Sequence, residues 1–375
     1  QDEMLEVFKT IHQHPELGFD ETKTEKLVAE KLKSYGYDVT TGMGKTGIVA
    51  KLKNGEGKVT IGLRADMDAL PIQEATSLDY RSDVNHVGHM CGHDGHTTML
   101  LGAAAYLAKH KNFNGTLILI FQPAEEIMGG AKAMLKDGLF DKFPMDYVFG
   151  MHNMPGLEKG KIHVTAGPVL TAVNNLEITL KGSGGHGSSP EKTRDPIVAA
   201  CALGISLQTI VSRNIAPQEK GVVTIGSIQA GDAPNVIPDT AILRLSCRSG
   251  SNEMRKLVIE KIHDITEGIA KAYNVEFNIK ELQEGAAVDN DKEQTEKVVE
   301  IAKKTFGEEN VIYPAPTFMA SDDFAFFAQK VPGVYSFIGD GDKGTPLHTP
   351  KYEFDTDILP IGAAYWVSIA ENYLV

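Results

Sequence analysis

The chain has 375 residues, of which 42% are hydrophobic and 23% are charged, values typical of a globular protein. This length exceeds the usual size of one hydrophobic core, so we expect two domains. The 37 Lys and Arg residues against 50 Asp and Glu residues leave a net charge of −13. Because nucleic acids and anionic membrane surfaces are bound mostly through Lys and Arg, this charge argues against both as partners.

Cysteine usage indicates the compartment. The three cysteines, Cys91, Cys201 and Cys247, are too few and too odd in number for a disulfide framework. The sequence shows neither a signal peptide nor a long apolar run, and it therefore predicts a cytoplasmic protein.

The first part of the chain alternates predicted helices and strands. Apolar residues recur at helical spacing over residues 4–11 and 27–35, and Gly36 is expected to end the second helix. Residues 46–53 and 58–63 are predicted strands joined by a turn. The later elements of this part are a helix over 97–109, a strand over 116–121 and a strand over 147–151.

From about residue 173 the pattern changes to a self-contained set of strands and two helices, which indicates a small α+β domain. After Gly285 the α/β pattern resumes. We therefore expect an α/β protein with an open mixed sheet that forms a catalytic domain, interrupted by a smaller inserted domain. The predicted boundaries are 1–172 and 286–375 for the catalytic domain and 173–285 for the insert.

The residues from His89 to His96 form the densest chemical cluster in the sequence, with three histidines, a cysteine and an aspartate. Thiolate, imidazole and carboxylate are the ligands that a zinc-like cation prefers. One residue separates Cys91 from His93, so both side chains can turn to one point. His93 and His96 are three apart and can share a face where a helix begins. The cluster predicts a metal site.

Other metal-type side chains stand just past the carboxyl ends of predicted strands. They are Asp66 and Asp68, Glu125 and Glu126, and His152. In open α/β sheets that edge is where ligands bind. We expect these side chains to lie at the metal cluster. We expect the same of His348, which stands in a Gly- and Pro-rich loop. Asp66 and Asp68 alternate in an extended segment, and we choose Asp68 as the group that orients a ligand histidine.

Each of these residues also has a plain structural interpretation. Glu125 and Glu126 would stabilise the start of a helix, and His152 would be a satisfied, half-buried histidine. Beside the metal cluster we favour the functional interpretation, because a catalytic metal needs a nearby general base. The segment 182–187 fits the dinucleotide pattern GxGxxG, but no acidic residue follows about twenty positions on, so that interpretation is rejected. His186 then lies in a glycine loop, where it either reaches across a cleft or is solvated.

Seven segments together resemble the aminoacylase-type metallopeptidases, in the amidohydrolase branch that contains hippurate hydrolase, auxin-conjugate hydrolases and N-acetyl-diaminopimelate deacetylase. The segments are RADMDALP at 64–71, HMCGHDGH at 89–96, QPAEE at 122–126, GMHN at 150–153, GGHGSSP at 184–190, PNVIP at 234–238 and LHTP at 347–350. They occur in the family's order and span nearly the whole chain.

The resemblance implies metal-dependent hydrolysis of the amide bond of N-acyl amino acids by two divalent ions per subunit. These are zinc or manganese, with cobalt or nickel also compatible. The implied metal ligands are Cys91, His93, Glu126, His152 and His348. Glu125 is the implied general base and acid, and Cys91 is the candidate for a bridging thiolate.

The insert is implied to act as a lid and to form a homodimer or a higher oligomer. By resemblance, His186 reaches the partner's active site and stabilises the oxyanion, while Asn235 and Arg248 contact the substrate. Two departures from the family pattern put the choice of acyl group in doubt: Ile127 and Met128 follow the glutamate pair, and Asp322 stands where many relatives have Glu.

Two other functions fit parts of the sequence. An amidase with Cys91 as nucleophile needs only a cysteine near a histidine, but it leaves the acidic residues at other strand ends unexplained. A non-catalytic metal-binding relative would have lost a residue needed for chemistry, yet every such position is filled.

Overall fold

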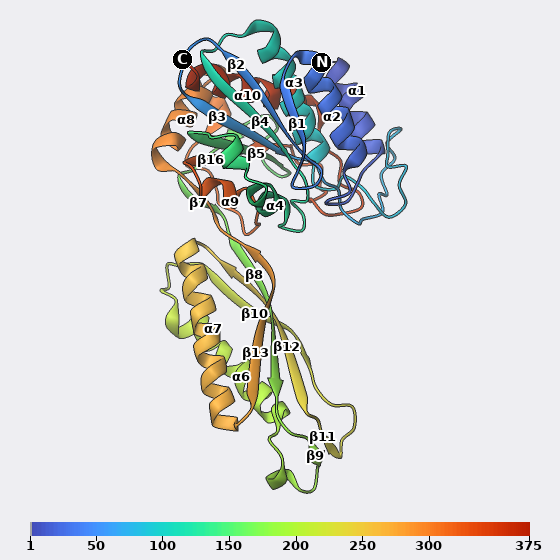
Figure 1. Ribbon diagram of the computed structural model, residues 1–375, viewed down its shortest axis with the longest axis vertical. Helices are drawn as coiled ribbons and strands as arrows, with labels where there is room; N and C mark the ends of the chain where they lie inside the picture. The colour runs from blue at the N-terminus through green and yellow to red at the C-terminus, as the bar shows by residue number, and fades with distance from the viewer. Residues whose placement is uncertain (1) are drawn as a thin grey trace. The chain divides into compact units, whose positions relative to one another are not determined.

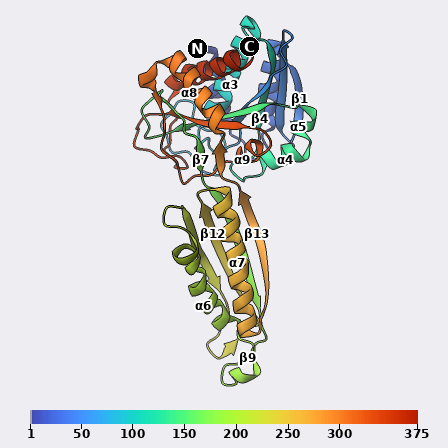
Figure 2. The same cartoon turned by 90° about the vertical axis from the view of Figure 1, so that its left-hand side faces the viewer.

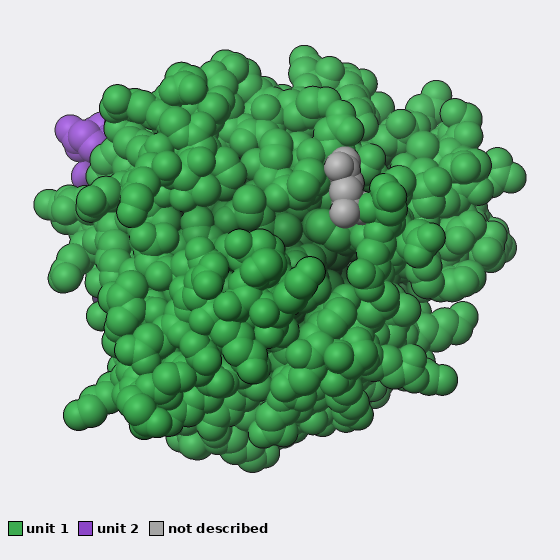
Figure 3. All heavy atoms as spheres, turned by 90° about the horizontal axis from the view of Figure 1, so that it is seen from above, with its two compact units in different colours: residues 1–169, 289–317, 322–375 green, residues 170–288, 318–321 purple. Residues whose placement is uncertain are grey.

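The computed structural model describes residues 2–375 and forms two compact units. Unit 1 comprises Gln1–Val169, Asp289–Thr317 and Asp322–Val375, and is green in Figure 3. Unit 2 comprises Leu170–Val288 and Phe318–Ser321. Each unit has its own hydrophobic core, and we describe each by itself.

Unit 1 is built on an eight-stranded sheet with the order β1-β2-β4-β3-β5-β16-β6-β15 (Figure 1). Its strands are β1 (Asp38–Met43), β2 (Gly47–Asn54), β3 (Thr60–Asp66), β4 (Gly115–Gln122), β5 (Tyr147–Met154), β6 (Ile162–His163), β15 (Val311–Ile312) and β16 (Gly333–Gly339). β3 is parallel to both β4 and β5, whereas β2 is antiparallel to both β1 and β4. The predicted α/β class with a mixed sheet is confirmed. Although a turn joins β2 to β3, the two strands are not neighbours, because β4 lies between them.

Alternate residues of the central strands point to opposite faces of this sheet. Leu63 and Leu119 belong to the main core on one face, whereas Arg64 and Ile120 point to the other. The helices on the core face are α1 (Asp2–Gln13), α2 (Thr22–Tyr35), α3 (His93–His110), α8 (Lys292–Phe306) and α10 (Leu359–Tyr373). The short helices α4 (Gly130–Lys136) and α9 (Ala325–Ala328) pack against each other near β4 and β16.

Two glycines set where helices begin and end in unit 1. α2 ends at Gly36, which has φ +92° and donates its N–H to the carbonyls of Leu32 and Lys33, as the sequence predicted. α3 begins at His93, directly after Gly92 with φ +91°. A Cβ on Gly92 would lie 2.3 Å from Asn153 Oδ1. Glycine at this position therefore lets the metal-type cluster approach the end of β5.

Unit 2 is an antiparallel four-stranded sheet with the order β10-β12-β8-β13, with two helices packed side by side on one face (Figure 2). The strands are β8 (Ala172–Lys181), β10 (Gly221–Gln229), β12 (Thr240–Ser249) and β13 (Glu276–Gly285), and the helices are α6 (Pro196–Leu207) and α7 (Asn252–Tyr273). Leu203 of α6, Ile262 of α7 and Leu243 of β12 meet in its core. A small antiparallel two-stranded sheet of β9 (Gly185–His186) and β11 (Val236–Ile237) also belongs to the unit.

One helical stretch, Pro196–Asn214, is long and apolar enough to cross a membrane by length and composition alone. It is α6 with the π turn that follows it. Its inner side, which includes Ala199, Leu203 and Leu207, is buried in the core of unit 2. Core helices commonly pass such a test, so the stretch is weak evidence for a membrane span.

The exposed glycine in the middle of α7 offers a test of the helix assignment. A Cβ on Gly268 would meet no atom within 4 Å, and glycine in a helix interior costs about 1 kcal/mol relative to alanine. Gly268→Ala should therefore raise the stability of unit 2 by about that amount, measured by denaturant unfolding followed by circular dichroism. A loss of stability would contradict a solvent-facing position in a regular helix.

Candidate active site

Five side chains from four separate parts of unit 1 converge at the carboxyl ends of its central strands. Cys91 precedes α3, His93 lies in its first turn, Glu126 follows β4, and His152 lies near the end of β5. His348 comes from the loop before α10, and its N–H donates to the carbonyl of Met90 at 2.8 Å. That hydrogen bond fastens the loop to the segment that carries Cys91.

Cys91 stands at the centre of this group. Its Sγ lies 3.5 Å from His152 Nε2 and 3.3 Å from His348 Nε2. Cys91, His93 and His152 each offer a ligand atom within 4.8 Å of the other two, and the same holds for Cys91, Glu126 and His348. All five predicted ligands are thus brought together, in two overlapping sets that share the thiol.

Two polar atoms in this group are left without hydrogen-bond partners. His93 Nε2 and Glu126 Oε1 are buried, and neither finds a partner within residues 2–375. Such buried groups are rare in native proteins because each carries a desolvation penalty. Glu126 Oε1 is 3.8 Å from His93 Nε2 and 3.5 Å from His348 Nε2. Divalent cations among these atoms would supply the missing partners, so the residues present fit a metal centre.

Asp68 fixes the positions of two predicted ligands, His93 and Glu126, through hydrogen bonds. Its carboxylate accepts the N–H groups of Glu125 and Glu126, each at 3.0 Å. Its carbonyl oxygen is 2.8 Å from His93 Nδ1, which leaves Nε2 as the nitrogen that faces the cluster. Asp68 therefore occupies the orienting position that the sequence suggested for it, between a ligand histidine and the turn that carries both glutamates.

The two adjacent glutamates have opposite electrostatic environments. Burial, followed by the negative charges of Asp322 and Glu126, raises the pKa of the Glu125 carboxyl well above its usual range. Burial also acts to raise the pKa of Glu126, but the close approach of His348 and the charge of His93 outweigh it and lower that pKa. Paired carboxyl groups whose pKa values are pushed apart are suited to different roles, one as a proton carrier and one as an anionic ligand.

The environment of Cys91 argues against a nucleophilic cysteine. Burial and then the carboxylates of Glu126 and Glu125 raise the pKa of its thiol well above the usual value. A catalytic cysteine needs the opposite shift, towards the thiolate. Only a bound cation would favour the thiolate here.

A buried charge network lies beside this centre, and the sequence analysis missed it. The guanidinium of Arg64 is fully buried and donates to Asp66 at 2.6 Å, to Asp322 at 3.0 Å and to Asp323 at 3.3 Å. Tyr335 also donates to Asp322. Asp322, noted as a departure from the family pattern, is therefore a member of this network. It also lies with Asp323 close to Glu125, with their carboxylate oxygens within 4.8 Å of one another.

The network continues into the back of the metal cluster. Asp66 Oδ1 is 2.6 Å from Nδ1 of His96, and Nε2 of His96 is 2.8 Å from Oδ1 of Asn153. The amide of Asn153 in turn donates to Asp340 and Tyr352. Both nitrogens of His96 are therefore engaged by protein groups, so His96 supports the site and is not among the ligands we assign. The position of Asn153 beside His152 was the only sequence signal for this support.

The other three predicted site residues lie in unit 2. His186 pairs with Val236 in the small β9–β11 sheet, and its Nδ1 lies 2.7 Å from Ser188 Oγ. The carbonyl of Asn235 accepts the N–H of Gly187 at 2.8 Å beside the same strand pair. Arg248 lies at the far end of β12, where it donates to Ser321 Oγ at 2.8 Å. Asn235 and Arg248 therefore flank opposite ends of β12.

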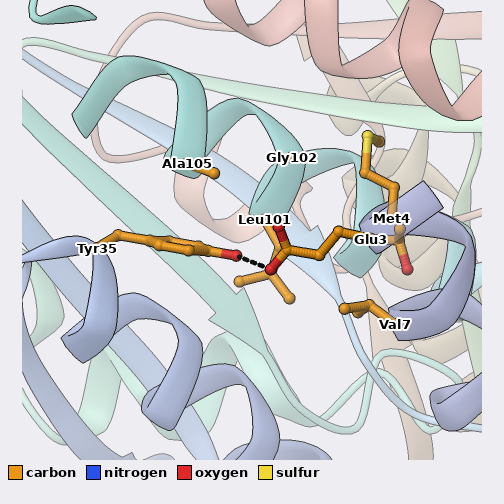
Figure 4. A pocket seen from close by; sticks show the side chains of 8 residues that line it. Glu3, Met4, Val7, Tyr35, Leu101, Gly102 and Ala105 are labelled. Atoms are coloured by element: carbon orange, nitrogen blue, oxygen red, sulfur yellow. Dashed lines mark hydrogen bonds between the residues drawn. The ribbon is translucent and has the colours of Figure 1, made fainter. Parts of the chain in front are cut away.

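Figure 4 shows a hollow elsewhere in unit 1, between α1, α2 and α3, with a volume of about 180 Å³. Its carboxylate, Glu3, already accepts hydrogen bonds from Lys31 at 2.6 Å and from Tyr35 at 3.3 Å. The other lining side chains are mostly apolar. The hollow lacks the unpartnered polar atoms of the metal cluster, and we assign it no chemistry.

Comparisons with known proteins agree with this site. Residues 62–372 match the model of peptidase family M20/M25/M40. The chain is 48% identical to hippurate hydrolase from Campylobacter jejuni over 374 residues, covering 100% of this chain and 97% of that protein.

Two solved structures are also similar. A proposed aminohydrolase from methicillin-resistant Staphylococcus aureus has a TM-score of 0.95 at 35% identity, covering 100% of this chain and 97% of the other. The Bacillus subtilis YXEP protein, described as a dinuclear metal binding peptidase, has a TM-score of 0.86 at 33% identity, with coverages of 100% and 98%.

Site and similarities together define a metal-dependent hydrolase that uses two divalent cations. The chain belongs to peptidase family M20/M25/M40, and its reaction is hydrolysis of the amide bond of N-acyl amino acids. The expected family, fold class and reaction are thereby confirmed.

His12 of α1 is buried and contacts the segment that carries Cys91 and His93. Its Nδ1 is 2.7 Å from Asp94, next to His93, and its Nε2 is 3.3 Å from Glu74. Burial alone would lower the pKa of His12, but the hydrogen bonds to Asp94 and Glu74 outweigh it and raise the pKa to about 9. The charged imidazolium therefore stabilises the folded chain below pH 6.5, and this contribution is lost as the pH rises through about 9.

Replacement of His12 should reveal that pH dependence. His12→Gln should lower the free energy of unfolding by about 3 kcal/mol near pH 6, and the difference from the unmodified chain should shrink towards pH 10. Unfolding is measured in chelator, so that metal release does not contribute. His263→Gln, at an exposed histidine of α7, is the control. A difference in the free energy of unfolding between His12→Gln and the unmodified chain that widens as the pH rises would contradict a charged His12.

Proposed function

We propose that Glu125 is the general base and acid of this hydrolase, and that Cys91, His93, Glu126, His152 and His348 hold its two cations. The observation that carries the proposal is geometric: ligand-type side chains from separate parts of the chain converge beside Glu125, and His93 Nε2 and Glu126 Oε1 are buried without a hydrogen-bond partner among residues 2–375. The raised pKa of Glu125 is in keeping with this role. A group that must accept and then return a proton near neutral pH needs a raised carboxyl pKa.

The five side chains would hold the two ions between them. Cys91 groups both with His93 and His152 and with Glu126 and His348, which supports assigning all five to the metal centre. A thiolate with imidazole ligands favours zinc, and the carboxylate also suits manganese. Once bound, the cations lower the pKa of a water molecule and polarise the amide carbonyl.

The protein groups then act in order. The carboxylate of Glu125 takes a proton from the attacking water and passes it to the leaving amine as the tetrahedral species collapses. Asp68 keeps the turn of Glu125 and Glu126 fixed through its two backbone hydrogen bonds. The products are a carboxylic acid and a free amino acid.

We further propose that the acyl group is aromatic. The Campylobacter jejuni relative, which is 48% identical along the whole chain, is named a hippurate hydrolase. Hippurate is N-benzoylglycine, so its acyl group is a benzoyl ring.

Unit 2 is proposed to act as a lid that also joins two subunits. Its edge strand β10 exposes Val222 and Ile228, and the neighbouring helix α6 exposes Ile205 at 76%. Exposed apolar side chains beside an unpaired strand edge are the features of an association surface. In this arrangement His186 stabilises the oxyanion in the partner's site. Asn235 and Arg248, at opposite ends of β12, would bind substrate in different subunits.

We also propose that the protein is cytoplasmic. In support, Cys91, Cys201 and Cys247 are all free thiols, and such thiols persist in a reducing compartment.

The two glutamates provide a matched pair of variants. Glu125→Gln should lower kcat by roughly a hundred- to ten-thousandfold while the protein keeps two metal equivalents, because only proton transfer is lost. Glu126→Gln should lose metal as well as activity. Metal content is measured by mass spectrometry after dialysis. If Glu125→Gln loses metal and Glu126→Gln does not, Glu125 is the metal ligand and Glu126 is the proton carrier.

The association surface can be tested by adding a charge. Ile205→Glu should convert the dimer to a monomer in light scattering and, because His186 then reaches no partner site, lower kcat by roughly a hundred- to a thousandfold. Leu282→Glu is the matched control, since Leu282 is 48% exposed on β13 at the other edge of the same sheet. A fully active monomer would refute the action of His186 across subunits.

A further inference from the structure

An exposed aliphatic side chain stands directly beside the catalytic glutamates. Ile127 follows Glu126 in the chain and is 56% exposed, whereas the side chains of Glu125 and Glu126 are 8% and 9% exposed. Of the other large exposed apolar residues of unit 1, Tyr106 lies near the opposite end of α3 from His93, and Val375 is the last residue of the chain. A single exposed apolar side chain is common on protein surfaces; what distinguishes Ile127 is that it directly follows Glu125 and Glu126 in the chain.

The turn that carries Ile127 is rigid. Met128 donates its N–H to the carbonyl of Glu125 at 2.7 Å, and both Gly129 and Gly130 donate to the carbonyl of Ala124, at 3.2 and 3.1 Å. Ala124 and Met128 have φ of +51° and +55°, a region that costs free energy for residues other than glycine. The turn is thus held in an unusual conformation by three backbone hydrogen bonds.

Phe19 is fixed against the same turn from another part of the chain. The preceding residue, Gly18, packs so closely that its Cβ would lie 3.0 Å from Ala124. The buried carboxylate of Glu21 accepts the N–H of Ala124 at 2.8 Å and the hydroxyl of Thr46. These contacts on either side of Phe19 position its half-buried ring beside the turn.

Gly129 leaves a space between the two apolar side chains. A Cβ at this position would lie 3.3 Å from Cε2 and Cζ of Phe19 and 3.7 Å from Cγ1 of Ile127. The backbone of Gly129, with φ −117° and ψ −28°, is one that any residue adopts. Glycine is therefore required here by space and not by conformation. We call Phe19, Ile127 and Gly129 the acyl slot.

We propose that the acyl slot binds the acyl group of the substrate and selects an aryl group over acetyl. One wall is the edge of an aromatic ring and the other is a branched aliphatic chain, and both surfaces favour contact with a flat apolar ring. An acetyl methyl group offers these walls one carbon, whereas a phenyl ring offers a flat apolar surface of six. The proposal rests on the proposed function, because it takes the amide carbonyl to lie at the metal cluster beside Glu126, and it adds the residues that set the specificity.

Two variants test the slot in different ways. Gly129→Ala fills the space, and Ile127→Ala removes a wall without adding an atom. The measurement is kcat/KM for N-benzoylglycine and for N-acetylglycine, with metal content determined in parallel. In both variants the benzoyl-to-acetyl ratio of kcat/KM should fall by at least about tenfold, the usual discrimination of an apolar pocket contact. Tyr106→Ala, at a 42% exposed aromatic residue on α3, should leave the ratio unchanged.

The outcomes separate this proposal from the proposed function. A ratio that stays within about twofold in Ile127→Ala, with metal bound, would overturn the acyl slot and leave the metal-dependent reaction standing. Unmodified enzyme that cleaves N-acetylglycine better than N-benzoylglycine would also overturn it. Unmodified, metal-loaded enzyme that cleaves no N-acyl amino acid would overturn both. If Gly129→Ala loses metal through distortion of the turn, the result with Ile127→Ala decides.

Discussion

The site depends on a concentration of acidic groups buried at one edge of a sheet. Asp66, Asp68, Glu125, Asp322 and Asp323 are all buried there, and buried anions are costly unless positive charge is near. The positive charge of Arg64 partly compensates the carboxylates that accept its hydrogen bonds. Its guanidinium and two histidines lower the pKa of Asp66 despite burial, whereas burial still raises the pKa of Asp323.

Glu125 and Glu126 lie beyond direct hydrogen bonds from Arg64, and there divalent cations are the natural compensation. Two cations held by neighbouring thiol, imidazole and carboxylate groups would stabilise the same charges that destabilise the site in their absence. Metal binding is then coupled to the stability of this part of the fold. The acidic excess that complicates folding is the feature that creates the catalytic centre.

Backbone strain is concentrated at the same place. Ala124 and Met128 flank the glutamate pair with positive φ, and His348, a proposed ligand, has φ +61°. Such conformations persist only where other interactions fix them. Here the fixing groups are the carboxylates of Asp68 and Glu21, which accept the N–H groups of the turn, and the carbonyl of Met90, which accepts that of His348.

The convergence of the five proposed ligands could be predicted because these residues carry local signals. Cys91 and His93 are one residue apart in a dense cluster, and Glu126 and His152 lie at the ends of apolar strands. The end of the helix at Gly36 was also predictable, because glycine accommodates the positive φ that ends α2 there. Asp68 could be chosen over Asp66 only weakly, because two alternating aspartates offer no sequence criterion for which one turns towards a ligand.

What the sequence could not show depends on distant pairings. Arg64 and Asp322 are 258 residues apart, and Tyr335 looks like any apolar residue of a buried strand. The insertion of β4 between β2 and β3 is a choice of topology that strand patterns leave open. The space at Gly129 likewise arises from Phe19, over a hundred residues away. Local composition predicts which residues take part in the chemistry. The groups that fix those residues in place, and the groups that select the substrate, are determined by tertiary packing.

The most direct test of the central claim is a titration of metal-free enzyme with zinc or manganese, following the release of free amino acid from N-benzoylglycine. If the centre holds two cations through the five converging side chains, activity is absent in chelator and reaches its maximum at two metal equivalents per chain. Release of amino acid at an unchanged rate in chelator, with no metal bound to the protein, would contradict the account.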